Sequence, residues 1–305
     1  MKPIHALGTL FDRLYSDRNV ARLERATMVA ACTGFFVHLA LIALSRHVPE
    51  APAIVQGVGT SYFGAIYTPF SFILFYEVLM LVKVLPQSIT TAIGKQFEIL
   101  SLVTVRNVFK DIAELGDIEG WTDQPEALRV LLYDMGGAVA MFALVACFYH
   151  MRRKGRAIGG ADRLSSFIAL KKSIGVLLTA LFVVMASVSL IGWAMAEIRG
   201  AGSPDVPGVD LDLIFFPDFF KVMIFTDVLL LIASFAITNS YRYVFRNAGF
   251  VISTILLRVS ITAPTYYDLG AALIGMVFGI TILAGFNYTT YVESRQSRQD
   301  GDEVE

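Results

Sequence analysis

The segment ILFYEVLMLV (residues 73–82) has a counterpart 150 positions later in MIFTDVLLLI (residues 223–232). Four of the ten positions are identical, and Glu77 aligns with Asp227. This acid is the one charged residue in each segment, and acids are rare inside such apolar stretches. The recurrence therefore predicts an internal repeat built from membrane-spanning helices.

Two further pairs of segments align in the same order along the chain. They are ILSLVTVR with VISTILLR (99–106 and 251–258), and YDMGGAVAMF with YDLGAALIGM (133–142 and 267–276). The first pair places Arg106 on Arg258, and the second places Asp134 on Asp268. Each half thus holds an acid, an arginine and an aspartate in a fixed order. The alternative is two unrelated apolar hairpins that align by chance.

The composition is that of an integral membrane protein. Of the 305 residues, 55% are hydrophobic and 17% are charged, whereas soluble domains carry about 25% charged residues. The lipid bilayer is therefore the expected partner. A net charge of −1 gives no general attraction to nucleic acid, so we expect no nucleic-acid partner.

The sequence gives no support for a metal centre, a cofactor or catalysis. Cys32 and Cys147 lie in apolar segments, and the four histidines show no ligand spacing. The chain also lacks a metalloprotease motif, a phosphate-binding glycine-rich loop and a Ser-His-Asp candidate set. We therefore expect no metal, no cofactor and no enzymatic activity.

Topology decides how many segments cross the membrane. Segments 96–109 and 247–262 have short apolar runs, yet counting both as spans places the basic regions on one side, as cytoplasmic loops require. We therefore predict an all-α bundle with eight transmembrane segments in two parallel four-helix repeats, with both termini cytoplasmic. The alternative has six spans and two partly inserted helices. The predicted parts are a first repeat with an amphipathic N-terminus (1–150), a basic cytoplasmic connector (151–172), a second repeat (173–291) and an acidic tail (292–305).

The intramembrane charges are the candidate functional residues. We expect Arg106 to pair with Asp134, and Arg258 with Asp268, because these residues lie at similar predicted depths. Glu77 and Asp227 would then remain near mid-membrane. A lone carboxylic acid there tends to be neutral, so it could load and release a proton or bind a small ion. The leading interpretation is nevertheless a structural or partner-binding role without catalysis, such as in a stress response. The alternatives are a proton-coupled transporter or a proton or ion channel that uses Glu77 and Asp227, and a voltage-sensor-like module.

Small residues recur in the last helix of each repeat, where they let helices approach closely. They are Gly136 in the first copy and Gly270, Gly275 and Gly279 in the second. Packing inside the bundle is the favoured interpretation, and assembly into a homo-oligomer is the alternative.

The order of an acid, an arginine and an aspartate in each unit resembles the phosphate-starvation-inducible PsiE-like proteins, which are small four-helix proteins of the bacterial inner membrane. The resemblance covers roughly residues 62–150 and 214–291. This chain departs from that pattern because it is doubled and has a long acidic connector in its first copy. The resemblance implies a fold and a membrane, but no activity.

Overall fold

The computed structural model describes residues 2–47, 62–115, 124–152, 161–200, 211–235, 240–261, 263 and 267–302. These residues form nine α-helices and no β-strand, which confirms the all-α prediction. The helices are α1 (Lys2–Leu14), α2 (Asp17–His47), α4 (Gly64–Val84), α5 (Ile89–Leu115), α6 (Pro125–Arg152), α7 (Ala161–Gly200), α8 (Leu211–Phe235), α9 (Tyr241–Ile261) and α10 (Tyr267–Asp302).

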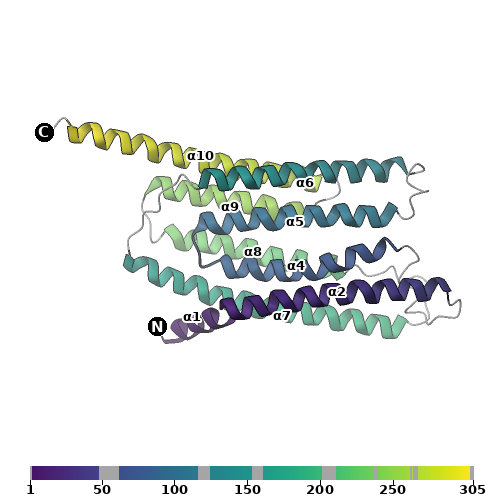
Figure 1. The fold of residues 1–305 in the computed structure, drawn as a ribbon. Helices are drawn as coiled ribbons and strands as arrows, with labels where there is room; N and C mark the ends of the chain where they lie inside the picture. The colour runs from purple at the N-terminus through teal and green to yellow at the C-terminus, as the bar shows by residue number, and fades with distance from the viewer. Residues whose placement is uncertain are drawn as a thin grey trace.

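The long helices lie in two layers (Figure 1). The first layer contains α2, α4, α5 and α6, and the second contains α7, α8, α9 and α10. Within each layer, helices that follow one another in the chain pack side by side, and α5 and α6 contact α9 and α10 across the layers. Both chain termini lie at the same end of the bundle, which we call the termini end; the opposite end is the distal end (Figure 1).

Six helices within the described part of the chain are long and apolar enough to cross a membrane: α2, α4, α6, α7 over Ser165–Ser189, α9, and α10 over Tyr267–Glu293. The doubtful segment 247–262 thus belongs to a helix that meets this criterion. The other doubtful segment, 96–109, lies in α5, which does not meet it, and neither does α8. Every 18-residue stretch of α5 and α8 contains at least three charged residues.

Several helix ends differ from the expected connectors. α5 continues to Leu115, so Asp111 is helical rather than part of an acidic loop. α7 begins at Ala161 and therefore includes Lys171, which was expected in the basic connector. α10 continues through Asp302, so most of the expected acidic tail is also helical.

Two buried apolar clusters form the core. One joins α4 to α7 and α8 through residues such as Val78, Phe182 and Phe219. The other joins α5, α6, α9 and α10, and Phe97 and Phe148 pack against each other within it at a ring-centre distance of 4.9 Å. Because lipid tails are as apolar as these side chains, close packing rather than exclusion from water holds such helices together.

Two of the predicted packing glycines lie at a helix contact within the bundle. A Cβ atom added to Gly279 would lie 2.7 Å from the Ser253 Oγ on α9 and 2.8 Å from the Phe97 Cζ on α5. Gly275 faces Leu256 and Leu257 on α9 in the same way. These two residues therefore serve internal packing, which was the favoured interpretation.

The structure does not place the other two predicted glycines at such a contact. A Cβ atom added to Gly136 or Gly270 would meet no described atom within 4 Å. The close approach of α6 to α10 occurs instead at Gly137, against the side chain of Leu269. In α6 the glycine at the helix contact is thus Gly137, one residue after the predicted Gly136.

Replacing Gly279 with valine should destabilise the bundle, because the new side chain would overlap Ser253 and Phe97. Overpacking of this kind costs about 1–3 kcal/mol. Thermal unfolding in detergent micelles measures the effect, with Gly136→Val on α6 as the matched control. Equal stability of the two variants would contradict the packing role of Gly279.

Candidate functional site

A buried ion pair links α8 to α9. The Arg258 Nη1 lies 2.7 Å from the Asp227 Oδ2, and the two side chains are 3% and 10% exposed. The hydroxyl of Thr254 donates a hydrogen bond of 3.2 Å to the same carboxylate oxygen. The predicted pair of Arg258 with Asp268 is therefore wrong, because Arg258 is held by the acid that was expected to remain alone.

A lysine that the sequence did not single out lies close to this pair. Lys171 of α7 is buried, its ammonium donates to the Gln87 carbonyl at 3.1 Å, and it lies 4.9 Å from the ring centre of Phe167. Lys171 and Asp227 line one cavity of about 40 Å³. Hydropathy gave no sign of this role, since Lys171 stands at the edge of a long apolar run.

Glu77 is buried in α4, at 8% exposure. The cations whose charges act on its carboxyl group are those of Lys95 and Arg106, both on α5. The first layer thus has its own buried acid within the electrostatic reach of cations on the next helix. Glu77 is not among the residues that line the two cavities described here.

A second cavity, of about 60 Å³, lies at the distal end where α5, α6, α9 and α10 meet. Asp134 from α6 and Asp268 from α10 both line it, although they are 134 positions apart in the chain. Its other polar lining residues are Thr104, Arg106, Asn107 and Ser260. The volume is sufficient for a few water molecules.

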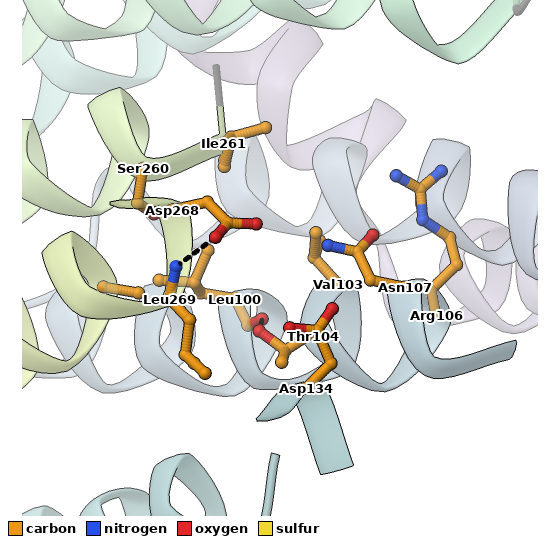
Figure 2. Close-up of a pocket in the computed structure, with 11 residues that line it drawn as sticks. Leu100, Val103, Thr104, Arg106, Asn107, Asp134, Ser260, Ile261, Asp268 and Leu269 are labelled. Atoms are coloured by element: carbon orange, nitrogen blue, oxygen red, sulfur yellow. Dashed lines mark hydrogen bonds between the residues drawn. The ribbon is translucent and has the colours of Figure 1, made fainter. Parts of the chain in front are cut away.

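Figure 2 shows how these side chains lie. The carboxylate of Asp268 accepts a hydrogen bond of 2.7 Å from the Leu269 amide, which fixes it at the first turn of α10. Asn107 lies on the same side of the cavity as Arg106, whose guanidinium is turned away from Asp134 (Figure 2). The structure thus brings the predicted partners Arg106 and Asp134 to one cavity, together with Asp268.

A third carboxyl group completes what we call the carboxyl cluster: Asp111, Asp134 and Asp268. Asp134 is 6% exposed, and the carboxyl groups of Asp111 on α5 and Asp268 on α10 lie near enough to interact with it. Tyr133, on the same helix as Asp134, also faces the charges of Asp134 and Asp268.

This arrangement suits a proton better than a metal ion. Within the described part of the chain, no three His, Cys, Asp or Glu side chains are grouped so as to hold a metal ion. Like charges in one buried site disfavour each other, and a shared proton removes part of that repulsion. Two like charges such as those of Asp134 and Asp268 therefore lie together more easily when one of the acids is protonated.

Sequence reasoning missed Asp111 because it assigned this residue to an acidic connector. A signal was nevertheless present: Thr104, Asn107 and Asp111 follow one another at spacings of three and four residues. That spacing places polar side chains on one side of a helix, and it would have extended the third predicted helix.

No protein-family model, curated protein or solved structure matches this chain significantly. The resemblance to PsiE-like proteins therefore stays a prediction. Function rests on the geometry of the charged residues alone.

Replacing Arg258 with methionine should destabilise the protein strongly, because it leaves Asp227 buried without its cation. Breaking a buried pair in this way costs about 3–5 kcal/mol. Unfolding by a denaturing detergent in mixed micelles measures the difference.

The same measurement on the double variant Asp227→Leu/Arg258→Met should show that most of the lost stability is recovered, because no unpaired charge is left buried. The matched control is Lys221→Met, which removes an exposed pair with Asp218 on the same helix and should cost about 0–1 kcal/mol. A loss for Arg258→Met no larger than the control would contradict the structural role of the pair.

Proposed function

We propose that this chain is an integral membrane protein that binds and releases protons at the carboxyl cluster, as part of proton-coupled transport. The observation that carries the proposal is that the buried Asp134 lines one cavity together with a second aspartate, so that two like charges would lie in one buried site unless a proton is bound. This second aspartate, Asp268, lines the cavity from the other layer. The proton-carrying acids would then be the three of this cluster, rather than Glu77 and Asp227.

The proposed topology has eight spans, with α5 and α8 included. Both lie inside their layers, between helices that meet the criterion for spans (Figure 1). Ion pairs account for several of the charges that exclude them on composition: the buried pair of Asp227 with Arg258, and the more exposed pairs of Asp218 with Lys221 and of Lys95 with Glu98. Polar residues inside membranes face the bundle interior and pair with one another in this way.

The proposed orientation places the termini end in the cytoplasm. The basic residues of the N-terminal segment and of the expected connector 151–172 support this side, because cytoplasmic loops carry an excess of lysine and arginine. The carboxyl cluster then lies toward the outer side of the membrane. The same chain order of helices in both layers supports two parallel repeats, and the bacterial inner membrane follows from the PsiE-like resemblance.

The second candidate is a non-transporting membrane scaffold. The observation that favours it is the Asp227–Arg258 pair, which is buried and also bonded to Thr254. In this case the acids would only tie helices together, and the basic cytoplasmic segments would bind a partner. A voltage-sensor-like role has less support, because Arg258 is held by Asp227 and Arg242 by Glu293.

Replacing Asp134 or Asp268 with asparagine should abolish proton flux into proteoliposomes under an imposed pH gradient. Removing a positioned group that transfers protons lowers the rate by roughly a hundredfold or more. The matched control is Glu126→Gln, an exposed acid on the same helix as Asp134. Absence of flux in the wild-type protein, or equal flux in all three variants, would favour the scaffold.

A further inference from the structure

The contact between α5 and α6 contains a line of polar side chains that leads to the carboxyl cluster. Glu98 of α5 accepts a hydrogen bond from the Tyr149 hydroxyl of α6. Six residues further along α5, the Thr104 Oγ1 lies 3.1 Å from the Met141 Sδ of α6. Asp111 of α5 and Asp134 of α6 lie near each other further along the same two helices. Together with these two acids, the contacts define what we call the α5–α6 seam.

Glu98 lies at the end of this seam that is nearer to the termini end of the bundle. It also binds the ammonium of Lys95, and its side chain is 31% exposed. The guanidinium of Arg152 lies 5.7 Å from the ring centre of Tyr149. The carboxylate of Glu98 can therefore be reached from outside the core, and it is bonded to two groups that carry protons, the Tyr149 hydroxyl and the Lys95 ammonium.

Two hydroxyl groups lie between Glu98 and the cavity. The Ser101 hydroxyl donates to the Glu98 backbone carbonyl at 2.7 Å, one helical turn from the Glu98 side chain. Thr104, one turn further, is buried and lines the cavity together with Asp134. At 1.5 Å per residue, the path from Glu98 to Thr104 is roughly 9 Å along the helix. Each hydroxyl can both donate and accept a hydrogen bond, as a proton relay requires.

The surroundings of the seam are apolar. Phe97, Met141 and Phe148 are fully buried beside it. Bulk water therefore has little access between Glu98 and Thr104. A proton that moves between these two residues would have to pass along the side-chain hydroxyl groups.

The corresponding seam of the second layer lacks these groups. The offset of 152 that places Arg106 on Arg258 also places Glu98 on Phe250, Thr104 on Leu256 and Asp111 on Ala263. Ser253, which falls on Ser101, donates to the Gly275 carbonyl at 2.7 Å. The α9–α10 contact is therefore built for packing, and the polar line is specific to the first layer.

We propose that protons exchange between the termini end and the carboxyl cluster along the α5–α6 seam, with Glu98 as the entry carboxyl and Thr104 as the last hydroxyl before the cavity. This inference rests on the proposed function, because it supplies the route to that site. It assigns different tasks to the two layers: the first conducts protons and the second provides a rigid support.

Two conservative variants test the route. Glu98→Gln keeps the oxygen that accepts from Tyr149 but replaces the oxygen that binds Lys95 with an amide nitrogen. Thr104→Val keeps the size of the side chain while removing its hydroxyl. The control is Thr281→Val on α10, whose hydroxyl is exposed and bonds only within its own helix in the described structure. Proton flux is measured in proteoliposomes, and equilibrium proton uptake after a pH step is measured for the same proteins in detergent.

The route predicts that Glu98→Gln and Thr104→Val lower the flux at least tenfold, while their equilibrium uptake equals that of the wild type. Uptake that the Asp134→Asn change does not reduce would mean that the carboxyl cluster binds no proton, and the proposed function would fall together with the route. Two results would overturn the route while leaving the proposed function in place. One is normal uptake with undiminished flux in Glu98→Gln or Thr104→Val, and the other is a loss of flux in Thr281→Val equal to theirs.

Discussion

A charge inside a membrane must be bonded or neutralised, because an unpaired ionised side chain at the bilayer centre costs at least about 2.5 kcal/mol. The interior of this bundle satisfies that constraint in two ways. In the second layer Arg258 neutralises Asp227 directly, at 2.7 Å. At the distal end two acids, Asp134 and Asp268, line one cavity instead, where a bound proton would remove part of the repulsion between their charges.

These two solutions give the two layers different properties. The ion pair is buried and its carboxylate is also bonded to Thr254, so it fixes α8 against α9. A carboxyl cluster beside a cavity of about 60 Å³ can change its charge by a single proton. Because Asp134 and Asp268 come from different layers, that change acts on the α6–α10 contact, where Gly137 lets the two helices approach closely. Proton uptake is thereby coupled to helix packing.

Much of the fold followed from the sequence, because hydropathy identifies long apolar helices such as α2 and α10 directly. The pairing of the charges did not follow, since a long arginine side chain reaches a partner at a different predicted depth; Arg258 therefore bonds to Asp227 rather than to Asp268. Lys171 and Asp111 were missed for a related reason. Each stands at the charged edge of an apolar run, where composition indicates a loop although the helix continues.

The central claim is that the carboxyl cluster holds a proton, and infrared spectroscopy of the protein in bilayers tests it most directly. The carbonyl stretch of a protonated carboxylic acid differs from the bands of a carboxylate, so the two forms are read separately. We predict a protonated-carboxyl band that grows as the pH is lowered below neutral, that loses intensity when Asp134 is replaced with asparagine and that keeps its intensity when Glu126 is replaced with glutamine. A spectrum without such a band, or a band that the Asp134 variant leaves unchanged, would contradict the account.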